Sequence, residues 1–198
     1  MNIGLTGGIA TGKSTVAKLL TDRGALLIDL DRIAREVVSP GQSALGQIVQ
    51  QFGQTILQPD GTLNRKQLGK IVFADPDRRK QLEAITHPAI RTVMQTRMQE
   101  FEQLYPDRLT VVDVPLLYES RLASYFSCVV VVYVPRAEQL RRLMERDKLT
   151  RKESEERLAA QMDIEEKRER ANYVIDNSGS FEQTRQQVNQ FWQELRPA

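Results

Sequence analysis

The sequence predicts an α/β fold, a doubly wound five-stranded parallel sheet with helices on both faces. Short apolar, β-branched runs alternate with helical patterns, as in sheets whose parallel strands are joined by crossover helices. Two of these runs, residues 109–114 and 128–134, are apolar at successive positions, which is typical of strands covered on both faces. A chain of 198 residues is expected to form one domain that carries an insert.

A glycine-rich run follows the first expected strand, residues 2–6. Residues 7–14 read GGIATGKS and fit the phosphate-binding pattern G-x-x-x-x-G-K-[ST], and a helix with an apolar stripe follows. Strand, loop and helix come in the order that a phosphate cradle requires, whereas the alternative is a chance glycine-rich turn. We expect nucleotide contacts from the loop residues Gly8, Ala10, Thr11, Gly12, Lys13, Ser14 and Thr15.

The chemistry of this loop follows from its residue types. Glycines allow backbone turns in which successive N–H groups point at a phosphate, and the helix N-terminus adds a favourable dipole. Lys13 is expected to reach the β- and γ-phosphates, and the Ser14 hydroxyl to ligate Mg²⁺. The loop therefore predicts a nucleotide site that works with Mg²⁺.

The other elements follow in chain order. Further strands are expected at 25–29, 109–114, 128–134 and 172–176, and helices at 30–39, 136–147, from a capping box at Thr150 and Glu153, and after Ser180. Residues 42–104 show helical patterns only, at 44–52, 65–74 and 76–104, and Pro88 is expected to break or kink the last. We expect a core of about 1–40, 105–135 and 171–198, a helical insert of about 41–104 that shapes the acceptor pocket, and a lid of about 136–170.

Composition narrows the class of protein. The chain is 40% apolar and 27% charged, which is ordinary for a globular protein, and its net charge of +2 gives no reason to expect a nucleic-acid or membrane partner. The only cysteine, Cys128, lies in an apolar run and is expected to be a buried strand residue rather than a nucleophile. With no signal peptide or transmembrane segment apparent, we expect a cytoplasmic protein.

Acidic residues follow two of the expected strands. Asp29 and Asp31 come just past the second strand, where one carboxylate could orient an acceptor hydroxyl and take its proton, although both could instead serve the start of a helix. Asp113 closes the third strand, where a carboxylate often organises the metal, although it could instead bind nearby backbone.

The charged segment 136–170 holds eleven basic and ten acidic residues. One or more of its arginines could close over a triphosphate and stabilise the transferring charge. The balance of signs equally suits a solvated helix with i,i+4 ion pairs, so each single arginine stays ambiguous. The arginines concerned are Arg141, Arg142, Arg146, Arg151 and Arg157.

His87 is the only histidine in the sequence. It could act in catalysis, and the alternative is a hydrogen-bonding role at a helix boundary.

Several segments together resemble the dephospho-CoA kinase family over essentially the whole chain. The loop is shared with many enzymes, but the segments IDLDRIAR (28–35), HPAI (87–90) and DVPLLYE (113–119) are far more specific. LNR (63–65), IVF (71–73), RD (146–147), AAQM (159–162) and VIDN (174–177) are also similar to the family's sequences. Asn64 and Asp163 depart from residues common in the family, aspartate and proline.

This resemblance implies a P-loop kinase related in fold to nucleoside monophosphate kinases. It implies that ATP phosphorylates the ribose 3′-hydroxyl of dephospho-CoA, giving coenzyme A, with Asp31 as the base and Lys13 and Arg146 neutralising the transferred group. Arg65, His87 and Tyr118 would hold dephospho-CoA, Asn177 would contact the nucleotide, and Ser14 and Asp113 would serve Mg²⁺. A monomer is expected, with a small oligomer left open.

Two other functions are alternatives to this one. Another small-molecule or nucleoside monophosphate kinase would share the fold and the loop. A GTP-dependent switch protein would need a base-reading Asn-Lys-x-Asp motif, which the sequence lacks. Its Asp-x-x-Gly switch should follow the third strand, but the only match, residues 176–179, follows the last.

Overall fold

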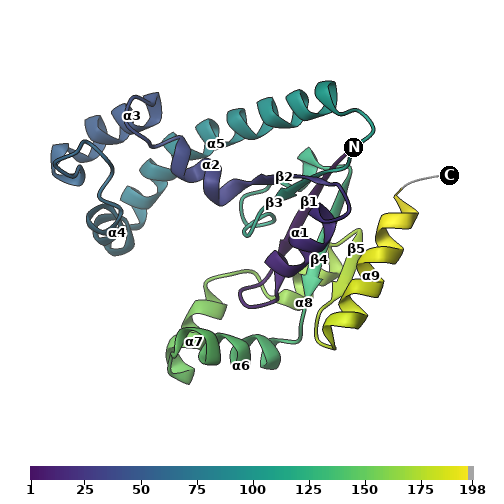
Figure 1. The fold of residues 1–198 in the computed structure, drawn as a ribbon. Coiled ribbons are helices and arrows are strands. Elements are labelled where there is room, and N and C mark those ends of the chain that lie inside the picture. Colours follow the sequence, from purple (N-terminus) through teal and green to yellow (C-terminus); the bar gives the residue numbers. More distant parts are fainter. Residues whose placement is uncertain (196–198) are drawn as a thin grey trace. The chain divides into compact units, whose positions relative to one another are not determined.

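The computed structural model, which describes residues 1–195, contains a five-stranded sheet (Figure 1). The strand order is β2-β3-β1-β4-β5. Parallel pairing joins β1 to β3 and β4, and β4 to β5. At the β2 edge, Leu26 N–H donates to Leu109 O at 2.8 Å. The strands are β1 (Asn2–Gly7), β2 (Leu26–Asp29), β3 (Thr110–Asp113), β4 (Cys128–Tyr133) and β5 (Tyr173–Asp176).

Chain contacts divide the protein into two compact units. The first contains residues 1–28 and the chain from Glu100 onward, and the second contains residues 29–99. The first unit holds α1 (Lys13–Thr21), η2 (Ala123–Tyr125), α6 (Arg136–Asp147), α7 (Arg151–Ala159), α8 (Ile164–Glu169) and α9 (Phe181–Glu194). The second holds α2 (Leu30–Glu36), α3 (Ser43–Phe52), η1 (Gln54–Ile56), α4 (Arg65–Ala74) and most of α5 (Pro76–Leu104). Residues 29–40, expected in the core, therefore belong to the second unit.

Apolar side chains bury both faces of the sheet. On one face, Leu20 of α1 and Phe191 of α9 belong to a buried cluster with Ile3 and Leu5 of β1. On the other face, Gly4 leaves room for the side chains of Leu117 and Phe126, which a Cβ at that position would meet within 3 Å. Successive residues of a strand point to opposite faces, so the near-continuous apolar runs of β1, β3 and β4 follow from coverage on both sides.

The helix boundaries expected from capping residues and prolines are confirmed. α4, α5 and α6 begin and end where the sequence predicted, and α7 and α9 open with capping boxes at Thr150 and Ser180. Side-chain oxygens there accept the N–H groups that the first helical turn leaves unpaired. Most of the strand ends lie one residue away from the expected position, and the other ends coincide with it.

One expectation about a helix end was wrong. The helix expected at 30–39 ends at Glu36, and Ser39 N–H donates to Glu36 O in a following turn. α5 continues through Pro88 to Leu104, so of the two effects expected of this proline, a break does not occur. Pro88 and Ala84, whose carbonyl loses its helical partner there, are both exposed, so water can bind that carbonyl.

The second unit is helical, as expected for the insert. Among its residues, the only pairing of extended chain is an isolated bridge between Leu57 and Leu63. Arg97 of α5 forms an ion pair with Glu36 at the end of α2, and this hydrogen bond lowers the pKa of the Glu36 carboxyl. Within residues 1–195, none of the helices is both long and apolar enough to span a membrane.

Candidate active site

The glycine-rich loop joins the carboxyl end of β1 to the start of α1. Gly12 lies before the first helical residue with φ of 82°, and Ala10 has φ of 62°, a left-handed conformation that non-glycine residues adopt rarely. Thr11 folds back on the loop, and its N–H and Oγ1 both donate to Gly8 O, at 3.3 and 2.9 Å. The loop therefore has the strand-to-helix geometry that presents N–H groups to a phosphate.

Lys13 and Asp113 meet at this loop. The Lys13 ammonium forms an ion pair with Asp113 Oδ1, and the two side chains are 17% and 14% exposed. β3 lies beside β1, with Asp113 in register with Leu5, so the sheet carries the Asp113 side chain to the loop. The structure thus places a carboxylate beside the phosphate loop at this position.

The donor set fits a magnesium ion. Ser14 is exposed on the first turn of α1, directly after Lys13, and Asp113 supplies a carboxylate beside the same loop. Mg²⁺ prefers oxygen ligands and often takes only one or two from the protein, with phosphate and water completing its shell. Within residues 1–195, His, Cys, Asp and Glu side chains nowhere gather as three or more possible ligands.

Asn177, which follows the edge strand β5, forms a hydrogen bond to the phosphate loop. Its Nδ2 donates to Thr11 O at 2.8 Å, and its Oδ1 accepts from Thr184 Oγ1 at 2.7 Å. Arg142 Nη2 donates to its carbonyl at 2.9 Å. A Cβ at Gly12 would lie far inside van der Waals contact with Asn177 Nδ2, so glycine is required here by packing as well as by φ.

Two glutamines of the charged segment also bear on the loop. Gln161 Oε1 accepts the Ile9 N–H at 2.9 Å, after the end of α7. Gln139 of α6 is buried, and a Cβ on Gly8 would come within 2.5 Å of its Oε1. The sequence gives no sign of the role of Gln139, and Gln161 belongs to the segment AAQM (159–162) without standing out in it. Glutamines in a charged segment carry no pattern that distinguishes them from surface residues.

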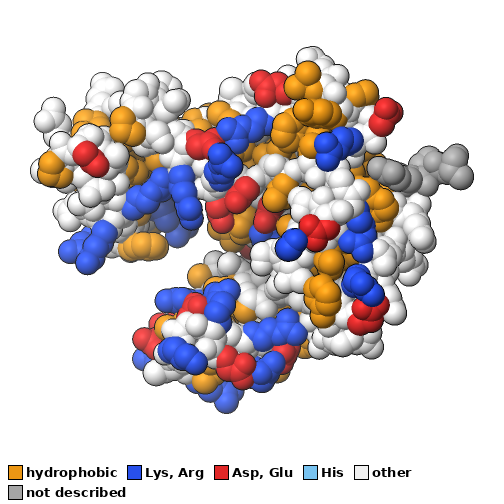
Figure 2. Space-filling view, in the orientation of Figure 1, with side chains coloured by type: hydrophobic (Ala, Val, Ile, Leu, Met, Phe, Trp, Pro, Cys, Tyr) orange, Lys and Arg blue, Asp and Glu red, His pale blue; other side chains and the backbone are white. Residues whose placement is uncertain are grey.

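The arginines of α6 and α7 are engaged in ion pairs with nearby acids. Arg146 donates to Asp147 at 2.7 Å, and this hydrogen bond raises the pKa of the Arg146 guanidinium. Glu138 accepts from Arg141 and Arg142, and those hydrogen bonds, with the Arg141 bonds the larger influence, lower its pKa to about 2. The solvated ion-pair pattern is thus present, and Figure 2 shows basic and acidic side chains interspersed over the surface of these helices. The other pairs are Arg151 with Glu155 and Arg157 with Asp147.

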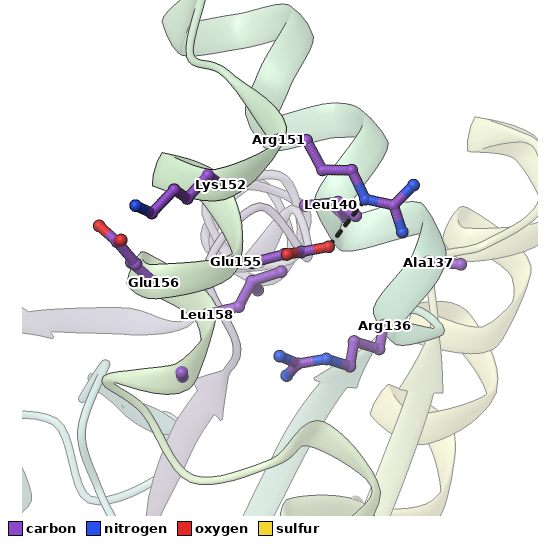
Figure 3. A pocket seen from close by; sticks show the side chains of 9 residues that line it. Arg136, Ala137, Leu140, Arg151, Lys152, Glu155, Glu156 and Leu158 are labelled. Carbon is purple, nitrogen blue, oxygen red and sulfur yellow. Dashed lines mark hydrogen bonds and ion pairs between the residues drawn. The ribbon is translucent and has the colours of Figure 1, made fainter.

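A pocket of about 580 Å³ lies between α6 and α7 (Figure 3). Arg136 extends toward it from the start of α6, and Arg151 of α7 forms an ion pair with Glu155 in its lining. Lys152 and Glu156 complete its charged lining. Loop residues 7–15 do not line this pocket, so it is a feature of the α6–α7 pair itself.

The second unit carries the remaining predicted residues except Tyr118. Asp29 caps α2, and its Oδ1 accepts Arg32 N–H at 3.1 Å, as the structural alternative anticipated. Asp31 is exposed in the first turn of the same helix. Arg65 is exposed at the first position of α4, and His87 is half-buried within α5. Asp31, Arg65 and His87 stay predictions as site residues.

Tyr118 lies in the turn after β3. Its hydroxyl is buried and lacks a hydrogen-bond partner among the described residues. Burial raises the pKa of this phenol, Arg170 acts to lower it, and Cys128 acts to raise it. Cys128 is the first residue of β4, in register with Ile3, whereas the phosphate loop begins at the other end of β1. The contact of Tyr118 with dephospho-CoA stays a prediction.

Both departures from family residues are helix caps. Asn64 Oδ1 accepts Gln67 N–H at 3.0 Å at the start of α4. Asp163 Oδ1 accepts Glu165 N–H at 2.9 Å at the start of α8. Asn and Asp are both favoured at such positions, so each keeps a working helix start.

Comparisons with known proteins agree with this geometry. A model of the dephospho-CoA kinase family matches residues 1–183. A dephospho-CoA kinase of Shouchella clausii is 52% identical over 188 residues, which cover 95% of each chain. Among solved structures, TT1252 from Thermus thermophilus has a TM-score of 0.82 at 34% identity, covering 100% of this chain and 98% of that one. The dephospho-CoA kinase from Campylobacter jejuni has a TM-score of 0.77 at 33% identity, covering 98% and 96%. The chain belongs to the dephospho-CoA kinase family.

Proposed function

We propose that this kinase transfers the γ-phosphoryl group of ATP to the 3′-hydroxyl of the ribose of dephospho-CoA, giving coenzyme A and ADP. The observation that carries the proposal is the loop between β1 and α1, with the left-handed Gly12 at the start of the helix and Lys13 beside Asp113. The membership of the whole chain in the family supports the choice of acceptor.

At the phosphate loop, the protein would bind the ATP phosphates and neutralise their negative charge. Backbone N–H groups of Gly8 to Thr15 and the dipole of α1 would hold the phosphates, and Lys13 would leave Asp113 to neutralise the β- and γ-phosphates. Ser14 and Asp113 would hold Mg²⁺, which supplies further positive charge to the phosphates when bound. Asn177 supports this proposal because it fixes the loop at Thr11.

The acceptor side needs a base and a binding surface. Asp31 would accept the proton of the ribose 3′-hydroxyl as its oxygen attacks the γ-phosphorus, and ADP would leave with the electrons of the broken bond. Arg146 would leave Asp147 to neutralise the transferred group. Arg65, His87 and Tyr118 would bind dephospho-CoA.

An acceptor screen tests the function. ADP release from Mg·ATP would be measured with dephospho-CoA beside AMP, CMP, UMP and adenosine, and the product would be identified by mass spectrometry. Turnover largely confined to dephospho-CoA, with coenzyme A as product, supports the proposal. Turnover with a monophosphate alone would refute the acceptor while keeping the loop as the nucleotide site.

A matched pair of substitutions tests the base. Asp31→Asn should lower kcat by about 10²–10⁴, because general-base catalysis contributes on that scale. Asp29→Asn, two residues earlier, alters the cap of α2 and should leave kcat near that of the unaltered enzyme. Near-normal turnover of Asp31→Asn would remove Asp31 from the mechanism, and equal losses in both variants would assign the effect to the helix start.

We further propose a monomer that works in the cytoplasm. One chain carries the loop, the charged α6–α7 pair and the second unit, and Cys128 is the only cysteine, which suits a reducing compartment. Light scattering after size exclusion should give the mass of a single 22.6 kDa chain. A larger mass that persists on dilution would contradict the monomer.

A further inference from the structure

Lys167 of α8 is a lysine whose side chain is entirely buried, with an exposed fraction of 0%. Lysine is almost never fully buried unless it is paired, because removing its charge from water is costly. Lys167 Nζ lies 2.8 Å from Glu119 Oε1 and donates to Pro115 O at 3.3 Å. The ammonium therefore ties α8 to the turn that follows β3.

The partners of Lys167 have a second set of contacts. Glu119 Oε1 also accepts Met162 N–H at 3.0 Å. Met162 belongs to residues 160–163, which join α7 to α8 and are called the returning segment below. Pro115 O also accepts from Thr6 Oγ1 at 3.3 Å, and Thr6 is the residue of β1 before the phosphate loop begins. One buried charge thus connects the returning segment, the turn after β3 and β1.

The returning segment carries Gln161, next to Met162. Gln161 Oε1 accepts the Ile9 N–H of the phosphate loop at 2.9 Å. Because the Met162 N–H is held by Glu119, the backbone next to Gln161 is fixed at one point, and its carboxamide is fixed to the loop at another. A loop held in its binding conformation before the ligand arrives binds more tightly than one that must be ordered on binding.

We propose that Lys167 is a positioning residue for nucleotide binding: through its ion pair with Glu119 it holds Gln161 on the Ile9 N–H of the phosphate loop. Lys167 acts through Glu119 and Gln161 and need not touch the nucleotide. The inference rests on the proposed assignment of this loop as the nucleotide site.

ADP affinity of single and double variants tests the coupling. Titration calorimetry with ADP and Mg²⁺ would compare the unaltered enzyme with Gln161→Ala, Lys167→Met and the double variant. Each single variant should lose the hydrogen bond that Gln161 makes to the Ile9 N–H, and this loss should raise its Kd for ADP by about tenfold. If both residues act through one contact, the double variant should also lose about tenfold, whereas independent effects would multiply to about a hundredfold.

Matched controls separate positioning from stability. Arg170→Met removes the exposed ion pair with Glu166 at the end of α8 and should leave the Kd unchanged. If Lys167→Met alone does not fold, Lys167→Met with Glu119→Leu removes both charges and leaves no unpaired one buried, a replacement that proteins often tolerate. Its Kd should rise by the same tenfold.

The outcomes are distinct. Non-additive losses in Kd at Lys167 and Gln161 support the inference, even where melting temperatures also fall. Folded Lys167 variants that bind ADP as tightly as the unaltered enzyme overturn it, and so do multiplying losses in the double variant. If the unaltered enzyme turns over dephospho-CoA but these variants do not differ from it, the function stands and only this inference falls. If the unaltered enzyme binds no ADP, both fall.

Discussion

Replacing Gly12 with alanine tests whether packing against Asn177 determines the shape of the phosphate loop. Gly12 has φ of 82°, and a left-handed conformation costs an alanine about 1–2 kcal/mol. The new Cβ would also displace Asn177 Nδ2, which now donates to Thr11 O. Losing that hydrogen bond adds about 1 kcal/mol. We therefore expect the free energy of unfolding of Gly12→Ala to fall by about 2–3 kcal/mol.

Gly61→Ala is the matched control. Gly61 has φ of 79°, and a Cβ there would meet no atom within 4 Å. This variant should lose only the backbone contribution of about 1–2 kcal/mol. The difference between the two variants isolates the contact with Asn177.

Urea unfolding followed by the fluorescence of Trp192, the sole tryptophan, measures stability, and calorimetry with ADP measures binding. Gly12→Ala should weaken ADP binding by at least about tenfold, because the loop N–H groups no longer converge, and Gly61→Ala should not. Asn177→Ala should cost less stability in the Gly12→Ala background than alone, since the contact and the hydrogen bond are already lost. Equal stabilities of Gly12→Ala and Gly61→Ala, with unchanged ADP affinity, would refute the reasoning.

Three further outcomes follow from single side chains. Lys13→Met should lower kcat by about 10²–10³ in the ADP-release assay while Lys18→Met, on the exposed side of α1, leaves it unchanged; similar values for both would contradict the proposed role of Lys13. The arginine hydrogen bonds hold the pKa of Glu138 at about 2, below its usual 4.5, so they stabilise the fold above pH 4.5 and are lost as the pH falls toward 2. The melting temperatures of the unaltered protein and Glu138→Gln should accordingly converge on acidification, and parallel curves would argue against this linkage. Burial raises the pKa of the Cys128 thiol, so iodoacetamide at pH 8 should alkylate the native chain far more slowly than the urea-unfolded chain, as mass spectrometry would show; equal rates would mean that Cys128 is accessible.

Local chemistry explains which parts of the fold were predictable. The starts of α4 and α5 and the capping boxes of α7 and α9 agree with expectation because a cap depends on residues three apart. The loop was predictable for the same reason, since strand, glycines and helix follow one another within residues 2–21. Whether Pro88 breaks α5 was not predictable in this way, because it depends on the solvent exposure of the freed carbonyl, which is a property of the folded helix.

The contacts that shape the candidate site could be learned only from the tertiary structure. Gln161 on Ile9 and Asn177 on Thr11 are hydrogen bonds between residues 152 and 166 positions apart, and Lys13 and Asp113 are separated by 100. Sheet order decides such meetings, because β3 lies between β2 and β1 and thereby brings Asp113 to the loop. The sequence by itself determined the motif, most helix boundaries and the family resemblance, since these are local patterns. Which distant side chains hold the loop, and why Lys167 is buried, depended on how the strands pair and how α8 packs against them.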